Sequence, residues 1–343
     1  MSKLTDDPRT DPRLKKVFDN PAAENPGDVA NRAELLRAAN TKEAKAMAER
    51  IKAFLATCDT EEIAPSDGLT IRTLQFNSEP DENTINIQFI RPQTDEILPC
   101  VYYIHGGGMQ SMSCYNYRAW GKIIAQQRVA VAMVDFRNAL TPSSASEVAP
   151  YPAGLNDCVS GLKWVANNGD DLEIDLNRVI VAGESRGGNL TLATGLRLLR
   201  EGKQSLIQGL YALCPYIAGI WPLEESPSSF ENNGILLELH NNRGAMAYGI
   251  EEIKRKNPLA WPGFATEDDV RGLPPTVISV NECDPLRDEG LNFFRLLLRA
   301  GVQATCRQLM GTIHGTEVFP IACPDISRET ARSIADFCRG ITR

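Results

Sequence analysis

The sequence predicts an α/β protein whose sheet is mostly parallel and covered by helices on both faces. From Pro99 onward, short apolar runs such as 100–104 and 129–134 are followed by helical patterns. Buried continuous strands that alternate with helices are typical of parallel sheets. A second observation is the apolar run 179–182, which passes through a glycine-flanked serine into the apolar segment 190–199. This is the pattern of a buried strand, a tight turn and a buried helix.

The composition excludes several classes of protein. The chain has 343 residues, of which 43% are hydrophobic and 23% charged, as in ordinary globular proteins. A net charge of −8 without Lys/Arg-rich blocks argues against binding to nucleic acid or anionic membranes. Residues 1–20 lack the apolar core of a secretory signal, and no apolar run is long enough to span a bilayer. Nine scattered cysteines without a CxxC pair predict buried thiols of a cytoplasmic protein.

The chain before Pro99 divides into three parts. Residues 1–27 are rich in Pro, Asp and Asn and are expected to be either loose or draped over the surface. Apolar residues recur at helical spacing over 29–56, which predicts one or two amphipathic helices that must cover another part of the protein. The alternating runs 69–76 and 84–90 predict an antiparallel β-hairpin.

The chain after Pro99 supplies the predicted parallel sheet and one interruption. Strands are expected at 100–104, 129–134, 179–182, 209–213, 276–280 and 304–309, and a last amphipathic helix over 326–338. Residues 215–262 contain Pro, Trp, Asn and Gly without a clear period. We interpret this segment as an insertion that lies over the C-terminal edge of the sheet.

The pentapeptide Gly183-Glu184-Ser185-Arg186-Gly187 has the pattern G-x-S-x-G between a strand and a helix. The chain reverses there within a few residues, and the two glycines remove Cβ atoms that would clash. Ser185 is therefore expected at the tip of the turn, beside a helix N-terminus whose N–H groups favour a developing negative charge. This arrangement predicts a nucleophile.

A serine becomes a strong nucleophile when a base removes its proton and an acid orients that base. The chain contains three histidines, His105, His240 and His314. His314 is the predicted base, because it follows a late strand in a loop that contains glycines, and because an acid and then a base follow the serine of a G-x-S-x-G turn along the chain. For the acid we favour Asp284, directly after the strand 276–280, over Asp288 and Glu282.

The segment His105-Gly106-Gly107-Gly108 directly follows the strand 100–104. Consecutive glycines let the backbone approach a ligand and point its amides inward, as an oxyanion-binding loop requires. The N–H group of Arg186, next to the nucleophile, is the expected third donor. His105 is expected to brace this loop by hydrogen bonding, and no pair of histidines has the spacing of metal ligands.

Four segments, His105 to Gly108, Gly183 to Leu190, Asp284 to Gly290 and His314-Gly315, occur in this order along the chain. In this they resemble the hormone-sensitive-lipase-like (family IV) bacterial carboxylesterases of the α/β-hydrolase superfamily. The resemblance implies an eight-stranded, mostly parallel sheet flanked by helices, with a helical cap. It implies N-terminal cap helices over 1–60, an α/β-hydrolase catalytic domain over 61–214 and 263–343, and a cap insertion over 215–262.

By motif position, the resemblance also implies a role for each site residue. It assigns the nucleophile, acid and base to Ser185, Asp284 and His314, and the oxyanion donors to Gly107, Gly108 and Arg186. His105 and Gly106 are expected to support that loop. The family implies hydrolysis of small-molecule esters with short- to medium-chain acyl groups, without a cofactor or a metal. The oligomeric state stays open, with a homodimer among the alternatives.

One residue departs from the pattern of this family, and three aromatic residues have two possible positions. Arg186 stands where the family usually has a small residue, so its side chain is expected either in an outward salt bridge, to Glu184 or an acid of the cap, or in a pocket wall. Trp221, Phe230 and Trp261 are expected to form either pocket walls or the core of the cap.

The sequence therefore predicts a serine ester hydrolase that works through an acyl-enzyme. Two alternatives remain. The same triad also suits cleavage of amides, carbamates or lactones. A non-catalytic small-molecule receptor is disfavoured, because Ser185, Asp284 and His314 are all present. Specificity lies in the cap and loops, where a single sequence says least.

Overall fold

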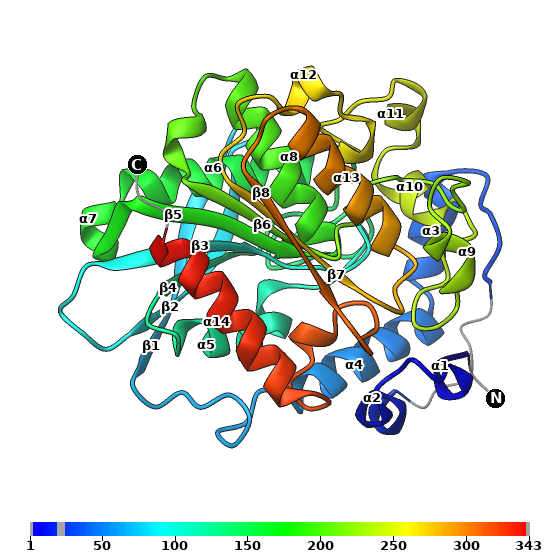
Figure 1. The fold of residues 1–343 in the computed structure, drawn as a ribbon, viewed down its shortest axis with the longest axis horizontal. Helices are drawn as coiled ribbons and strands as arrows, with labels where there is room; N and C mark the ends of the chain where they lie inside the picture. Colours follow the sequence, from blue (N-terminus) through cyan, green and yellow to red (C-terminus); the bar gives the residue numbers. More distant parts are fainter. Residues whose placement is uncertain (1–2, 19–24, 341–343) are drawn as a thin grey trace.

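The computed structural model describes residues 3–18 and 25–340, which form one eight-stranded sheet with helices on both faces (Figure 1). The strand order is β1-β2-β4-β3-β5-β6-β7-β8. The pairs β1–β2 and β2–β4 are antiparallel, and all pairs from β4 to β8 are parallel. The predicted α/β fold class is confirmed.

The strands follow the apolar runs of the sequence closely. They are β1 (Leu69–Ser78), β2 (Asn83–Pro92), β3 (Leu98–Ile104), β4 (Ala130–Val134), β5 (Ile174–Glu184), β6 (Gly209–Leu213), β7 (Thr276–Asn281) and β8 (Ala304–Leu309). Every residue of β3 and of β4 is buried, as expected of strands covered on both faces. The predicted hairpin is β1–β2, which forms the antiparallel edge of the sheet.

Helices cover both faces of the sheet and build the cap. They are α1 (Lys3–Asp6), α2 (Pro12–Val17), α3 (Arg32–Ala39), α4 (Lys42–Ala56), α5 (Arg118–Ala125), α6 (Ala153–Asn167), α7 (Gly169–Leu172), α8 (Arg186–Arg200), α9 (Ser228–Glu231), α10 (Arg243–Tyr248), α11 (Ile250–Lys254), α12 (Glu267–Val270), α13 (Arg287–Arg299) and α14 (Pro324–Gly340). Short 3-10 helices are η1 (Cys114–Tyr117), η2 (Gln204–Leu206), η3 (Pro262–Phe264) and η4 (Thr316–Val318).

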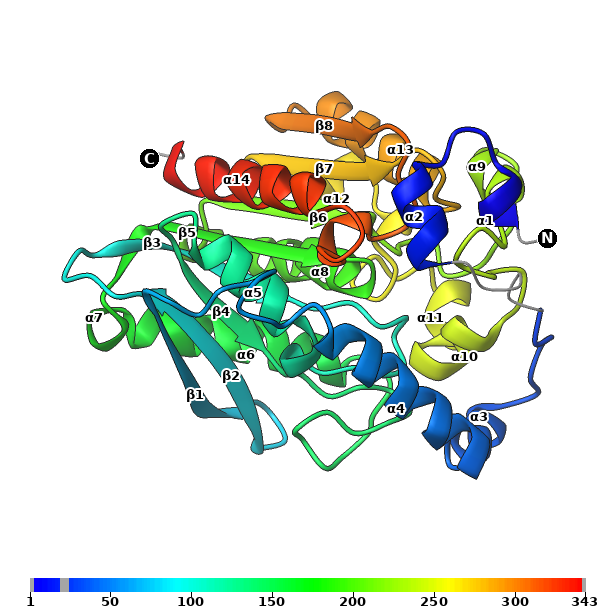
Figure 2. The same ribbon diagram turned by 90° about the horizontal axis from the view of Figure 1, so that it is seen from below.

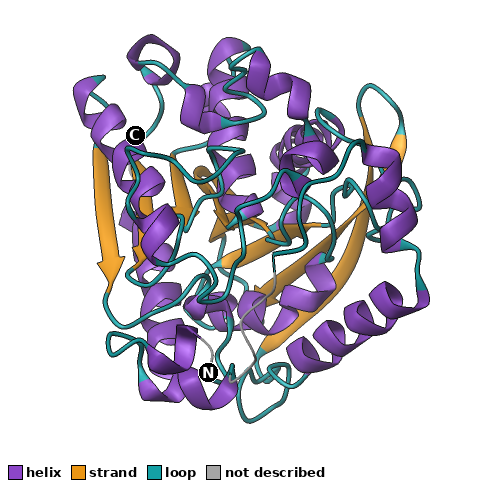
Figure 3. Ribbon diagram, turned by 90° about the vertical axis from the view of Figure 1, so that its right-hand side faces the viewer, coloured by secondary structure: helices purple, strands orange, loops and turns teal. Residues whose placement is uncertain are grey.

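Two apolar layers hold the helices to the sheet. Helices α6, α8 and α13 pack on one face, where Leu155 and Leu196 are fully buried. Helices α5 and α14 pack on the other face around Trp120 and Ile334 (Figure 2). The strands twist progressively from one edge of the sheet to the other (Figure 3). No helix within the described residues is both long enough and apolar enough to cross a bilayer.

The helices of the N-terminal segment and of the insertion, among them α3 and α10, lie at the end of the molecule toward which the parallel strands run (Figure 2). We refer to them as the cap helices. Leu35 of α3 packs with Leu140 and with Ala247 of α10, which joins the N-terminal helices to the insertion. A second cluster, around Trp221 and Trp261, packs the insertion against Met109 and Leu286 of the neighbouring loops. The division of the chain into 1–60, 61–214 with 263–343, and 215–262 stays a prediction.

The N-terminal segment is more ordered than the loose structure that was one of the two alternatives predicted for it. Residues 3–6 and 12–17 form α1 and α2, and their side chains Leu4 and Leu14 are buried in a cluster with Ile313. The N–H group of Asp11 also donates to the carbonyl of Gly311 at 2.9 Å. These helices are too short for a periodic pattern, so only the tertiary contacts reveal them. Part of the segment, residues 19–24, lies outside the described residues.

Candidate active site

Ser185 lies on the tight turn between β5 and α8. Its φ of 58° and ψ of −116° place it in a region that non-glycine residues rarely occupy. A Cβ atom on Gly187 would lie 1.9 Å from the carbonyl oxygen of Ile104, and one on Gly183 would lie 2.4 Å from the carbonyl oxygen of Gly187. The close approach of β3 and α8 therefore requires both glycines, as the pentapeptide predicted.

Ser185, His314 and Asp284 form one hydrogen-bonded chain. His314 Nε2 lies 2.9 Å from Ser185 Oγ, and His314 Nδ1 lies 2.7 Å from Asp284 Oδ2. All three residues are at least 95% buried. They lie after β5, β8 and β7 respectively, so the parallel sheet sets their relative positions. This is the geometry of a nucleophile, a base and an orienting acid.

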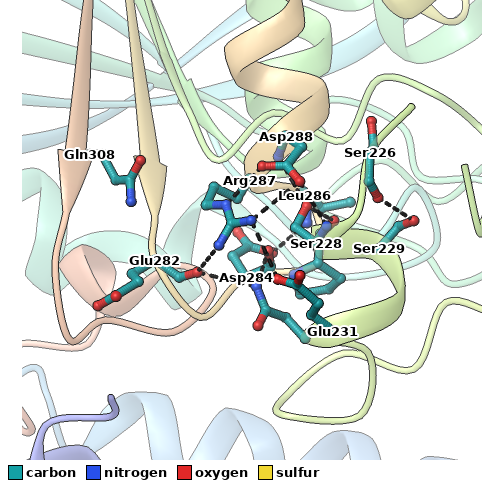
Figure 4. Close-up of polar contacts among 12 residues, drawn as sticks. Ser226, Ser228, Ser229, Glu231, Glu282, Asp284, Leu286, Arg287, Asp288 and Gln308 are labelled. Carbon is teal, nitrogen blue, oxygen red and sulfur yellow. Dashed lines mark hydrogen bonds and ion pairs between the residues drawn. The ribbon is translucent and has the colours of Figure 1, made fainter. Parts of the chain in front are cut away.

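The two other acidic candidates have different partners. Asp288 Oδ2 accepts a hydrogen bond from the N–H group of Ser228 at 2.7 Å, within the cluster shown in Figure 4. Glu282 Oε2 accepts one from the N–H group of Gly311 at 2.7 Å. Among the three carboxylates considered from the sequence, Asp284 alone contacts the histidine.

The loop that carries Asp284 is held by the cap insertion (Figure 4). Ser228 Oγ, at the start of α9, donates to the carbonyl of Pro285 and accepts from the N–H group of Asp288, both at 3.0 Å. The side-chain amide of Asn232 donates to the carbonyl of Asp284 at 3.0 Å. Ser228 and Asn232 lie in no motif, so the sequence analysis did not identify them.

The surroundings of His314 favour its protonated form. Burial acts to lower the pKa of His314, but the adjacent Asp284 carboxylate outweighs it, and the pKa rises to about 9. Glu184 Oε1, 3.5 Å from Nε2, adds to this effect. Burial raises the pKa of Glu184 and of Glu317 nearby. The imidazolium that forms when Ser185 loses its proton is therefore stabilised.

Gly107 and Gly108 face the same cavity as Ser185 and His314. Their φ values are 121° and 59°, which glycine adopts at little cost. A Cβ atom on Gly107 would also lie 2.2 Å from the carbonyl oxygen of Ser111. The structure thus brings the predicted oxyanion loop to the nucleophile, while the donor roles stay a prediction.

The two residues predicted to support this loop, His105 and Gly106, directly precede it and are buried. His105 is fully buried, and its Nδ1 lies 3.0 Å from the carbonyl oxygen of Gly106. Burial, with the nearby Arg186 cation, holds the pKa of His105 well below its usual range, so the ring is neutral. A Cβ atom on Gly106 would lie 2.1 Å from Glu184 Oε2, which explains the glycine.

The Arg186 side chain takes neither of the two predicted positions. It is 1% exposed, it makes no ion pair with any carboxylate of the described residues, and it does not line the cavity. Its guanidinium donates to the carbonyl of Gly106 at 2.6 Å and to Asn138 Oδ1 at 2.5 Å, and it stacks on the ring of Phe136 at 4.5 Å. Burial lowers its pKa to about 10, so it stays charged at neutral pH.

A cavity of about 340 Å³ opens above Ser185. It is lined by Gly107, Gly108, Gln110, Met112, Tyr117, Glu184, Ser185, Tyr216, Leu236, Leu237, Glu238, Leu239, Asn241, Gly244, His314 and Phe319. This lining combines apolar side chains with two carboxylates and contains neither lysine nor arginine. Trp221 and Trp261 belong to the cap core instead, and Phe230 is 48% exposed on the surface.

One group within the described residues has atoms close enough to hold a metal ion. Glu184, Cys214 and His314 each offer one ligand atom, and these atoms lie within 4.8 Å of one another. His314 Nε2 is also the atom that contacts Ser185 Oγ. A metal bound there would therefore compete with proton transfer from the serine, which does not favour a catalytic metal centre.

Comparisons with known proteins identify the family of this chain. Residues 101–318 match a family described as having the alpha/beta hydrolase fold. Carboxylesterase NlhH of Mycobacterium tuberculosis is 30% identical over 256 residues, covering 73% of this chain and 76% of NlhH. The solved structure of esterase Est22 is 68% identical, with a TM-score of 0.96 over 98% of this chain and all of that chain. Brefeldin A esterase, described as a bacterial homologue of human hormone-sensitive lipase, is 35% identical, with a TM-score of 0.88 over 98% of this chain and 94% of its own.

Proposed function

This chain belongs to the α/β-hydrolase fold family and hydrolyses carboxylic esters, and we propose that Ser185, His314 and Asp284 are its nucleophile, base and orienting acid. The observation that supports this proposal most directly is the buried chain of contacts from Asp284 Oδ2 through His314 to Ser185 Oγ, at 2.7 and 2.9 Å. Its serine end opens into the cavity.

In the acylation step, Ser185 Oγ attacks the ester carbonyl as His314 Nε2 takes its proton. Asp284 accepts a hydrogen bond from His314 Nδ1, which fixes the tautomer and stabilises the imidazolium. The carbonyl oxygen becomes an oxyanion that accepts hydrogen bonds from the N–H groups of Gly107, Gly108 and Arg186. His314 then gives its proton to the departing alcohol, which leaves an ester between Ser185 and the acyl group.

Deacylation repeats the sequence with water. His314 removes a proton from the water, which attacks the acyl carbonyl, and the same N–H groups hold the second oxyanion. When this intermediate collapses, His314 returns the proton to Ser185 Oγ and the carboxylic acid leaves. The mechanism uses side chains and backbone N–H groups of this chain together with water, and none of its steps needs a cofactor.

The cavity favours small, uncharged substrates. A volume of about 340 Å³ suits short- to medium-chain acyl groups, which the leucines of 236–239 contact through apolar surface. Glu184 and Glu238 line the same space without a compensating lysine or arginine. An ester that carries a carboxylate near its acyl end is therefore a poor substrate, because like charges repel in this enclosed site.

Hydrolysis of p-nitrophenyl esters of increasing acyl length tests the proposal. Ser185→Ala is expected to lose about 10³-fold or more of the wild-type activity. Ser333→Ala, a serine of α14 outside the cavity, controls for the loss of a hydroxyl. Retained turnover in folded Ser185→Ala would overturn the proposal, and comparison with a p-nitroanilide of the same acyl group separates ester from amide hydrolysis.

The location and assembly of the enzyme belong to the same proposal. All nine cysteines are free and all but Cys306 are buried, which supports a reducing, cytoplasmic environment. Homodimerisation stays a prediction, and sedimentation equilibrium at micromolar concentration would test it.

A further inference from the structure

The guanidinium of Arg186 is a buried cation that the reaction steps above do not use. Burying a charge is costly unless the protein supplies partners, and most buried arginines are paired with carboxylates. Arg186 has instead a carbonyl, a side-chain amide oxygen, the Nδ1 atom of His105 at 3.1 Å and an aromatic face. These partners lie at 105–106 and at 136–138, about 50 to 80 residues earlier in the chain.

The loop that follows Gly106 has an unfavourable backbone. Gly107, Gly108, Met109 and Met112 all have positive φ, at 121°, 59°, 63° and 85°. For the two methionines this conformation is unfavourable, because their Cβ atoms crowd the backbone there. Such a backbone persists only where its surroundings hold it in place. The loop with the predicted oxyanion donors therefore needs external anchors.

Arg186 and Asn138 together hold both ends of this loop. The Arg186 guanidinium donates to the carbonyl of Gly106, at the start of the loop. It also donates to Asn138 Oδ1. The amide nitrogen of Asn138 in turn donates to the carbonyl of Met112, at the end of the loop, at 2.8 Å, and to that of Thr141 at 2.9 Å. A shorter or an apolar side chain at 186 or at 138 would not make these hydrogen bonds to the carbonyls of Gly106 and Met112.

We propose that the Arg186 side chain is a positioning residue, which acts with Asn138 to hold the N–H groups of Gly107 and Gly108 in register with the Arg186 N–H group. One residue then contributes its backbone to the oxyanion hole and uses its side chain to fix the other two donors. Such donors act at 2.7–3.1 Å from the oxyanion, so a small loop shift weakens transition-state stabilisation more than substrate binding. The inference rests on the proposed function.

Substitutions at both ends of this contact test the inference. Arg186→Met keeps the backbone N–H group and much of the volume but removes the donors. Arg186→Lys keeps the charge, yet one ammonium group does not span Gly106 and Asn138 as the planar guanidinium does. Asn138→Ala removes the second anchor. Arg91→Met is the control, because Arg91 is also buried and bonded to carbonyls and does not line the cavity, although it additionally pairs with Glu173.

Three measurements distinguish positioning from a merely structural role. Endpoint titration with diethyl p-nitrophenyl phosphate gives the concentration of active enzyme, to which kcat and KM for p-nitrophenyl butyrate are normalised. The inhibition constant of an alkyl trifluoromethyl ketone, which forms a tetrahedral oxyanion on the serine, reports the oxyanion hole. We expect kcat to fall about 10- to 100-fold in Arg186→Met, Arg186→Lys and Asn138→Ala, with KM nearly unchanged. The inhibition constant should rise by the same factor.

The Arg91→Met control separates a loss of stability from a loss of catalysis. Arg91→Met should lower the melting temperature while kcat and the inhibition constant stay at wild-type values. Full activity in Arg186→Lys, or a loss of kcat in Arg186→Met without a matching loss of ketone affinity, would overturn the inference. Failure of the proposed function would appear separately, because the phosphate ester would then not label Ser185 in the wild-type enzyme.

Discussion

Replacing Asn232 by alanine is expected to weaken catalysis from a position outside the cavity. The buried amide of Asn232 donates to the carbonyls of Asp284 and Glu282, at 3.0 and 3.1 Å. Its Oδ1 accepts from the guanidinium of Arg9 at 2.8 Å. The substitution removes all three hydrogen bonds and leaves two backbone carbonyls of the acid loop without these donors.

The magnitude follows from the number and kind of these bonds. A neutral hydrogen bond contributes about 1 kcal/mol net, and one to a charged group about 2 kcal/mol. The Arg9 side chain is 34% exposed, which reduces its share. The free energy of unfolding is therefore expected to fall by about 3 kcal/mol. A displacement of Asp284 by ~1 Å would lower kcat by about 10- to 100-fold.

The assay compares Asn232→Ala with Asn233→Ala, which changes the neighbouring amide. Asn233 bonds to Glu238 and to the N–H group of Leu239, both in the cavity wall, at 2.8 Å each. Urea unfolding gives the stability of each variant, and kcat/KM between pH 5 and 10 gives the pKa of the base. Asn233→Ala is expected to change KM and to leave the pH profile intact.

In Asn232→Ala the rising limb of the profile should move to lower pH, because a weaker Asp284 contact raises the pKa of His314 less. A variant that loses stability but keeps the wild-type kcat and pH profile would refute the reasoning. The acid loop would then hold its position without the cap.

Three further substitutions test other parts of the structure. Asp284→Asn should lower kcat by ~10⁴-fold, and its residual activity should rise at lower pH than wild type, since the carboxylate raises the pKa of His314; a limb at higher pH would contradict this. Gly187→Ala places a Cβ atom 1.9 Å from a backbone oxygen of β3, so the variant should be misfolded by circular dichroism or inactive in the ester assay. A folded variant with wild-type activity would contradict the requirement for glycine in this turn. Asp157→Ala leaves the buried Arg137 guanidinium without its bidentate partner and should cost ~3–5 kcal/mol in urea unfolding; an unchanged midpoint would show that the pair is dispensable.

The parts of the site that could be predicted are those determined by residues close together in the sequence or by the order of motifs along the chain. The turn at Ser185 is determined by glycines two positions away and by the strand before it, so five residues suffice to identify it. His314 and Asp284 follow from chain order and from their places after predicted strands. Parallel strands then bring these loop residues to one edge of the sheet, which is why the contacts at 2.7 and 2.9 Å agree with the prediction.

The parts that could not be predicted depend on partners distant in the chain. For Arg186, the general preference of charges for water or for carboxylates suggested a salt bridge or an exposed wall. The groups that accept its hydrogen bonds, Gly106 and Asn138, follow β3 and β4. The residues around the pentapeptide give no indication of them. Asn232 likewise lies in an aperiodic insertion, and its role appears only when the insertion lies against the acid loop.

The contacts of α1 and α2 have a consequence for the order in which the enzyme becomes competent. During synthesis, residues 3–17 leave the ribosome well before their partners at 232 and 311, which belong to the last third of the chain. The nucleophile turn forms from sequence neighbours, whereas the acid and base loops also receive contacts from the N-terminal segment, through Asn232 and Gly311. Ester hydrolysis should therefore be sensitive to loss of residues 3–17, which removes the contacts from Arg9 to Asn232 and from Asp11 to Gly311.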